Sequence, residues 1–427
     1  MLIRKKNFQN HSSKQLALKT LFVFMIASIF FMTSTSLAQT KEPIKLGFII
    51  PLTGPFGTEA RDQEAGGILA VEEYNAKGGL LGRKVELLIR DDKLKPDESA
   101  RRAKELLEKD KVDLMAGSLG AHTQLAINEQ CKLAKTIFMS VSGSNEVTMA
   151  PDVSPYTFAE GPSPFTMSQA GGPWIFNNLG KKWFYLVADY SFGWQLTDGF
   201  RRIGKKLGVV EAGEIKHPLG TTDFTAYFPK ILAAEPDVLI LNNFGKDHLN
   251  SVKQAHEFGL KKKMKIYAPI ILFTSRLGLG DEPYEDVQGG TVFYWGLADT
   301  LPSAKAFVAN FNKRWGRPPS DYAGWAYSGV RGLLSAVERA GTLDTKKVIL
   351  ALEGHVYDHY KGKQWFRPWD HRSIQDFVII KSKSAKERTG QFDVFKIVDI
   401  VKGNDNLERS AEEMGLKVGV PLSSQLK

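Results

Sequence analysis

The stretch that decides the fold is IKLGFIIPLTGPFGTEARDQEAGGILAVEEYNAKGGLLGRKVELLIRDD, residues 44–92. It opens with a nearly continuous apolar run, which predicts a buried parallel strand, and the prolines and glycines that follow predict a tight loop. A helical pattern then ends at Gly78-Gly79, a pair typical of a helix C-terminus. Residues 85–89 alternate as a second strand that leads to Asp91-Asp92. The stretch is therefore predicted to be one βαβ unit, with its functional loops at the carboxyl ends of the strands.

The same pattern of strands and helices continues along the chain in two blocks. Four strand-and-helix repeats reach residue 140, and the pattern begins again at residue 165. Two successive α/β blocks of similar length predict two lobes, with crossovers near 156–160 and 291–295. Within the second block we expect helices over 165–179, 193–207, 224–234 and 247–258 and strands over 183–188, 209–215, 237–241 and 265–271. Beyond it we expect helices over 303–315, 320–340 and 344–353, a hairpin within 356–383 and a strand over 392–401.

Several residues of the opening stretch form a specific signature: Pro51-Leu52-Thr53-Gly54-Pro55, Gly57, the run from Asn75 to Arg83, and Asp91-Asp92. These residues resemble the type I periplasmic solute-binding proteins of ABC transporters, in the branch that includes leucine, isoleucine and valine receptors. The resemblance implies an α/β fold of two Rossmann-like lobes with parallel sheets, joined by a three-segment hinge. It also implies the division of the chain, with lobe 1 over 44–157 and 296–354, lobe 2 over 158–295 and 355–401, and a C-terminal tail over 402–427.

The first 38 residues have the composition of a secretory signal peptide. Five basic residues precede the apolar segment 21–32, and Ser36-Leu37-Ala38 offers a small-x-small cleavage site. This apolar segment is too short to cross a bilayer, which needs about 20 residues. We therefore expect an exported, periplasmic protein cleaved near Ala38.

The charge, the cysteine content and the spacing of glycines argue against several classes of protein. Five of the 57 basic residues lie in the signal segment, which leaves 52 Lys and Arg against 47 Asp and Glu, without the aromatic interleaving of nucleic-acid surfaces. Cys131 is the single cysteine, and its helical spacing from Ile127 predicts a buried thiol. The glycines over 78–82 lack the G-K-[ST] ending of a P-loop. We expect no nucleic-acid partner and no cofactor.

Hydroxyls and glycines gather in the loops that follow the strands of the first lobe. Such loops present backbone N–H groups that suit an anion. The residues alone leave two roles open for Ser118, which could bind a carboxylate or only cap a helix. The loops span residues 53–57, 117–120 and 140–145. The resemblance implies that Phe56 covers the ligand and that its carboxylate is held by Ser118, Ser142, Gly143 and Ser144.

The second lobe offers the segments 189–193 and 242–247 at the facing edge. The resemblance implies that Tyr190 and Phe192 cover the ligand. From their place after the strand that ends at residue 241, we expect Asn243 and Asp247 to add polar contacts. Amino-acid-binding members place an acidic residue after the strand 265–271, where this chain continues Ile-Ile-Leu-Phe. An ammonium without a counter-charge is costly to bury, unless Asp247, Glu160 or Asp91 substitutes. The expected solute is therefore a small carboxylate, which could be an amino acid, an aromatic or aliphatic acid, or an amide.

Two motifs favour other classes of protein. Residues 116–120 come close to the G-x-S-x-G elbow of serine hydrolases, with His256 or His371 as the base, but the first glycine is missing. His355 and His359 would suit a metal only on a helix. We expect instead a monomeric receptor that closes on its solute and docks on ABC permease subunits, or a ligand sensor of the same fold, and not an enzyme.

Overall fold

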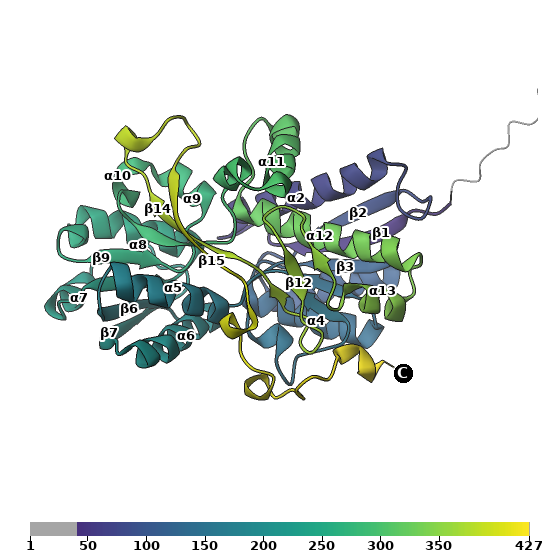
Figure 1. Cartoon of the computed structure of the whole chain (residues 1–427), viewed down its shortest axis with the longest axis horizontal. Coiled ribbons are helices and arrows are strands. Elements are labelled where there is room, and N and C mark those ends of the chain that lie inside the picture. Colours follow the sequence, from purple (N-terminus) through teal and green to yellow (C-terminus); the bar gives the residue numbers. More distant parts are fainter. Residues whose placement is uncertain (1–40, 427) are drawn as a thin grey trace, which may run out of the picture. The chain divides into compact units, whose positions relative to one another are not determined.

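Two β-sheets divide the chain into two lobes (Figure 1). The computed structural model describes residues 41–426, and the chain from Pro43 onward forms one unit. The signal peptide predicted over 1–38 lies outside the described residues. None of the helices in the described part is long and apolar enough to span a membrane.

The first lobe is built on a parallel sheet in the order β2-β1-β3-β4-β5. The apolar run of β1 is buried because this strand lies between β2 and β3. The predicted βαβ unit is confirmed. The strands are β1 (Ile44–Ile50), β2 (Val85–Asp91), β3 (Leu114–Gly117), β4 (Phe138–Ser140) and β5 (Thr157–Ala159), and the helices are α2 (Gly57–Ala76), α3 (Pro96–Lys104) and α4 (Ala121–Ala134).

Three later helices return to the first lobe. Figure 1 shows α12 alongside α2, and the two backbones approach so closely that a Cβ on Gly66 would lie 2.0 Å from the carbonyl oxygen of Ala323. Only glycine fits there. Glu73 of α2 also accepts a hydrogen bond from Tyr327 of α12 at 2.8 Å. These helices are α11 (Pro302–Trp315), α12 (Asp321–Ala340) and α13 (Thr345–Leu352).

The second lobe is built on a seven-stranded sheet in the order β15-β14-β10-β9-β8-β6-β7. Its strands are parallel except β14 and β15, which join antiparallel at one edge. The strands are β6 (Lys182–Ala188), β7 (Val210–His217), β8 (Val238–Asn242), β9 (Lys265–Ala268), β10 (Gln288–Thr291), β14 (Phe377–Ser382) and β15 (Phe395–Val401). The helices are α5 (Pro164–Asn178), α6 (Ser191–Leu207), α7 (Phe228–Ala233), α8 (Gly245–Glu257), α9 (Phe273–Leu279) and α10 (Asp281–Tyr284).

Two elements of this lobe are shorter than the sequence predicts. The helix expected over 224–234 begins only at Phe228, because Asp223 binds the Thr225 amide and hydroxyl and forms a turn instead. The strand expected over 265–271 ends at Ala268, since Pro269 has no N–H to donate to the sheet.

Three short crossovers join the lobes: Glu160–Ser163 after β5, Val292–Tyr294 after β10, and Gln375–Asp376 before β14. The hairpin before the third crossover lies against the first lobe. The predicted division had placed all of residues 355–401 in the second lobe. Its sheet bridges to the first lobe through Ala159 and Arg372, and Phe158 of β5 stacks on His371 at 3.8 Å. This sheet consists of β11 (Val356–Tyr357), β12 (Gln364–Phe366) and β13 (Ser373–Ile374). Only β14 and β15 continue into the second lobe, where β14 pairs with β10 and β15 pairs with β14.

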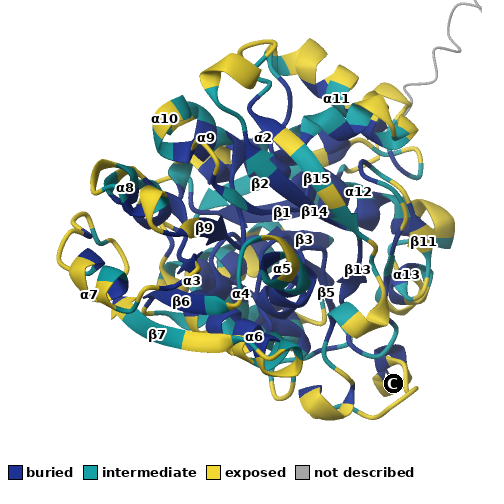
Figure 2. Ribbon diagram, turned by 60° about the vertical axis from the view of Figure 1, so that its left-hand side comes forward, coloured by how far each residue is buried: buried dark blue, intermediate teal, exposed yellow. Residues whose placement is uncertain are grey.

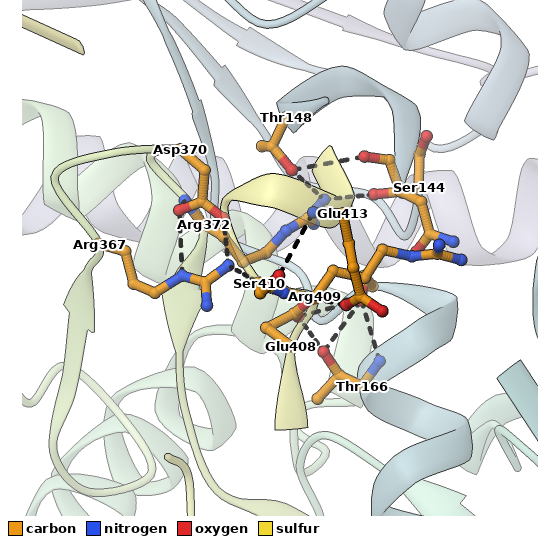
Figure 3. A network of polar contacts seen from close by, with 12 residues as sticks. Ser144, Thr148, Thr166, Arg367, Asp370, Arg372, Glu408, Arg409, Ser410 and Glu413 are labelled. Atoms are coloured by element: carbon orange, nitrogen blue, oxygen red, sulfur yellow. Dashed lines mark hydrogen bonds and ion pairs between the residues drawn. The ribbon is translucent and has the colours of Figure 1, made fainter. Parts of the chain in front are cut away.

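The tail after β15 contacts both lobes. Glu408 accepts a hydrogen bond from Thr166 in the first turn of α5 (Figure 3). It also accepts from Ser163, the residue before this helix. Farther along, the Leu422 amide donates to the Pro368 carbonyl at 2.8 Å and the Ser423 amide donates to Glu353 at 2.9 Å. The charged composition of this segment indicated a surface-bound or partly disordered tail, and the structure places it on the surface.

The interior follows the apolar pattern of the strands. Figure 2 shows the strands of both sheets largely buried, with exposure concentrated on outward helix faces and on β7. Most residues of β7 are exposed or half-buried because this strand lies at the edge of its sheet. Cys131 is buried, as its helical spacing predicted.

Candidate ligand-binding cavity

A cavity lies between the two lobes at the carboxyl ends of their parallel strands. Its volume is about 20 Å³, which is room for about one water molecule. In this arrangement the lobes close tightly on the cavity. Its lining comes from the loops after β1, β3, β4, β6 and β8 and from α5 and α12: Phe56, Leu119, Gly120, Ala121, Ser142, Gly143, Met167, Tyr190, Phe192, Phe244, Tyr322 and Trp325.

Aromatic rings form most of the cavity wall. Phe56 of the first lobe meets Phe244 of the second lobe edge to face, with ring centroids 4.8 Å apart. Phe244 in turn contacts Phe192 at 6.1 Å and Tyr322 at 5.7 Å. Edge-to-face rings at these separations attract each other, so the two lobes touch through the cavity wall itself.

The polar side of the cavity is the start of α4. Leu119, Gly120 and Ala121 line the cavity where this helix begins, and the N-cap residue Gly120 has no side chain to cap the first amides. The first N–H groups of a helix and its dipole both favour an anion. The first lobe therefore presents an anion-binding group to a cavity that is otherwise aromatic.

The neighbouring loop is held against this helix by its own hydrogen bonds. The Ser142 hydroxyl donates to the Leu119 carbonyl, and the Val141 amide donates to the Gly117 carbonyl at 2.7 Å. A Cβ on Gly143 would lie 3.3 Å from Met167 and 3.6 Å from Phe192, so this position has little room for a side chain. Five of the predicted site residues thus line the cavity: Phe56, Ser142, Gly143, Tyr190 and Phe192.

The other two predicted serines lie outside the cavity lining. Ser118 is fully buried, and its hydroxyl lies 2.6 Å from the Thr123 hydroxyl and 3.4 Å from the Asp92 carboxylate. The Ser144 hydroxyl donates to Glu146 at 3.0 Å. Both hydroxyls are engaged within the first lobe because short side chains after a strand find their nearest partners in the adjoining turn.

The two predicted polar contacts of the second lobe also point elsewhere. The amide of Asn243 donates to Ser251 at 3.1 Å. The Asp247 carboxylate accepts from the Gly220 amide at 3.0 Å, and burial raises its pKa to about 6. Neither residue lines the cavity, and none of the described lining residues carries a charge.

The sequence reading missed Trp325 of α12. Its side chain is fully buried and lines the cavity, and its indole Nε1 has no hydrogen-bond partner among the described residues. A buried indole N–H usually finds an acceptor. The helical pattern treated Trp325 as ordinary core, since a cavity-facing residue and a core-facing residue occupy the same stripe of an amphipathic helix.

The motifs that favoured an enzyme or a metal site are used otherwise. His371 bonds to Glu353 at 2.8 Å and to the Thr157 carbonyl at 3.0 Å, away from Ser118. His359 lies 3.3 Å from the Ser328 hydroxyl, and burial lowers its pKa to about 3. Among residues 41–426, no group of three His, Cys, Asp or Glu side chains is arranged to hold a metal ion.

Comparison with known proteins identifies relatives over most of the chain. The profile of a family described as "Periplasmic binding protein" matches residues 43–387. The chain is 25% identical over 377 residues to a protein of Pseudomonas aeruginosa named "Amino acid binding protein", covering 86% of this chain and 96% of that one. It is also 25% identical over 388 residues to a Leu/Ile/Val-binding protein homolog of Brucella melitensis, covering 88% and 95%.

Solved structures agree on the fold. A periplasmic binding protein from Burkholderia mallei superimposes with a TM-score of 0.79 at 26% identity, covering 87% of this chain and 97% of that one. A substrate-binding protein of an amino acid ABC transporter from Pseudomonas fluorescens superimposes with a TM-score of 0.81 at 24% identity, covering 89% and 100%. The predicted two-lobed α/β fold is thereby confirmed.

Proposed function

Because the chain belongs to the periplasmic binding protein family, a family of solute receptors and not of enzymes, we propose that it is the extracytoplasmic receptor of an ABC importer. In this role it would trap one small solute between its lobes and present the closed form to the permease subunits. The matches to substrate-binding proteins over nearly their whole length support the proposal.

The cavity favours a small carboxylate with an apolar or aromatic body. The observation that carries this choice is the pairing of the α4 N-terminus with six aromatic side chains and no charged lining residue among those described. A carboxylate gains hydrogen bonds at the helix start, and a flat apolar body fills the space between rings. An ammonium group would lose its hydration without meeting a counter-charge.

A neutral amino acid is the second candidate. It is supported by the name of the Pseudomonas aeruginosa relative, "Amino acid binding protein". In that case the ammonium would need carbonyl or hydroxyl acceptors such as Ser142, since the described lining offers no carboxylate.

Trp325 would complete the recognition of the solute. Its Nε1 has no partner among the described residues, so a bound solute with an acceptor in reach would satisfy it. The proposed solute therefore carries oxygen, as its carboxylate or as a further substituent.

Binding by lobe closure follows from the size of the cavity. A volume of about 20 Å³ is too small for a solute of this class, so the lobes must separate to admit it and then close on it. A solute that touches Phe56 and Phe244 together gains contacts only in the closed form, and this differential affinity shifts the equilibrium toward it.

A thermal-shift screen of the mature chain tests the proposal. The panel is benzoate, benzamide, butyrate and leucine, each at increasing concentration. We expect benzoate to raise the melting temperature, since a ligand at 100 times its Kd stabilises the folded state by about 2.7 kcal/mol. Stabilisation by leucine alone would favour the amino acid, and stabilisation by benzamide as strongly as by benzoate would exclude carboxylate recognition.

A further inference from the structure

The three crossovers between the lobes meet at one buried lysine. Lys361 lies in the loop between β11 and β12 and is 2% exposed. We propose that Lys361 and Gln375 form a hinge lock, which holds the lobes at one angle by tying all three crossovers together. The lock acts on the protein without its solute, so the proposal does not depend on which solute binds.

The lysine binds two of the crossovers directly. Its Nζ donates to the Val292 carbonyl at 3.1 Å on the second crossover. It also donates to the Gln375 side-chain oxygen and lies 3.4 Å from the Asp376 carbonyl on the third. An ammonium has three N–H donors, and three acceptors face it here.

Gln375 extends the lock to the first crossover. Its oxygen accepts from Lys361, while its Nε2 donates to the Glu160 carbonyl. This one amide of the third crossover therefore bonds to Lys361 at its oxygen and to the first crossover at its nitrogen. The Glu160 side chain is held in turn by Tyr357 and by Gln364, which donates at 3.0 Å.

The amine is anchored to the first lobe. Tyr360, the preceding residue, packs so closely on α12 that a Cβ on Gly324 would lie 2.5 Å from its ring. The Tyr360 ring also contacts Phe293 at 5.3 Å and Phe307 at 5.8 Å. Lys361 thus projects from a rigid part of the first lobe onto the segments that lead into the second.

Lobe rotation must disturb this arrangement. Hinge motions are absorbed by backbone rotation in a few connecting residues, which are here the residues whose carbonyls the lock binds. When the backbone of a crossover rotates, its carbonyl moves away from the Lys361 amine, which the first lobe holds in place. The contacts therefore favour the angle at which all of them form together.

The cost of burying this amine argues against a mere packing role. Burial lowers the pKa of Lys361, and the nearby Glu160 carboxyl opposes that shift. An apolar side chain of similar length would fill the same space without that cost. Two buried polar side chains that join three separate segments are better explained by the specific geometry they impose.

The test measures the lobe separation of the solute-free protein. Cys131 is buried and is the single cysteine, so spin labels can be placed at Leu350→Cys on α13 and Val210→Cys on β7, where the native side chains are 54% and 58% exposed. Pulsed electron paramagnetic resonance then gives the distribution of distances between the two labels. It is measured in the protein with the lock intact, in Lys361→Met and in Gln375→Met. Lys363→Met is the matched control, because Lys363 is exposed in the same loop.

We expect one narrow population to dominate the distance distribution of the intact lock and of Lys363→Met. Both lock variants should broaden it or add a second population of at least a tenth of the molecules. A distribution in folded Lys361→Met identical to that of the intact lock would overturn the proposal. Should Lys361→Met not fold, Gln375→Met decides alone, and unfolding of both variants would assign these residues to folding and refute the lock.

Discussion

The cavity and the hinge lock both join the two lobes, yet their polar groups are used in opposite ways. Trp325 in the cavity has a buried donor without a partner among the described residues. Lys361 in the lock faces an acceptor with every N–H it can offer. A buried donor without a partner is costly, and at the wall of a cavity a bound solute can supply the missing acceptor.

The difference separates recognition from motion. Cavity residues contribute to the free energy of solute binding, because they contact the solute in the closed state. Lock residues stabilise one lobe angle with or without a solute, since their hydrogen-bond partners are part of the chain. Changes in the cavity should therefore alter affinity at constant lobe separation, and changes in the lock should alter lobe separation first.

The largest effect is expected from filling the cavity. Gly143→Val places a branched side chain where a Cβ already lies 3.3 Å from Met167. Titration calorimetry with the best solute of the screen should show affinity reduced at least 100-fold, which is about 2.8 kcal/mol. Gly278→Val is the control, because a Cβ on this exposed glycine meets no atom within 4 Å. An unchanged affinity in Gly143→Val would remove this cavity as the binding site.

A smaller effect is expected from removing the indole donor. Trp325→Phe keeps a ring in the cavity wall but deletes Nε1, and we expect affinity about tenfold weaker, or about 1.4 kcal/mol. The matched control is Trp174→Phe, which deletes an indole donor bonded to Gln288 at 3.1 Å outside the cavity. That control should lower the melting temperature and leave affinity unchanged. The reverse pattern in the two variants would contradict the role of Trp325.

The smallest effect on binding is expected from Ser118→Ala. Its hydroxyl is bonded to Thr123 within the first lobe, so its loss should cost about 1 kcal/mol of stability in denaturant unfolding. Affinity for the solute should change by less than about twofold, or about 0.4 kcal/mol. A tenfold loss of affinity at unchanged stability would return Ser118 to the role that the family resemblance implies.

The parts of the site that could be predicted are those set by local sequence. Phe56, Ser142 and Gly143 follow directly after strands, and the carboxyl ends of parallel strands share one edge of a sheet. Chain order therefore placed their loops at the edge of the cavity, and the family resemblance singled out these residues within the loops. Phe192 follows β6 in the same way, on the facing lobe.

The parts that could not be predicted depend on long-range packing. Whether the Ser118 hydroxyl turns toward Thr123 or toward the cavity is decided by the neighbouring loop and by Asp92, 26 residues away. Trp325 comes from a helix far along the chain that reaches the cavity only because α12 packs on α2. No pattern near Trp325 distinguishes a wall of the cavity from a wall of the core.

The sequence by itself determined the α/β class, the two lobes and the edge at which a ligand would bind, because hydrophobic periodicity and turn residues act over a few positions of the chain. Only the tertiary structure decided which side chains face the cavity and that three crossovers meet at Lys361. Those outcomes depend on side-chain orientation and on contacts between residues such as Lys361 and Val292, 69 positions apart, which no local pattern encodes.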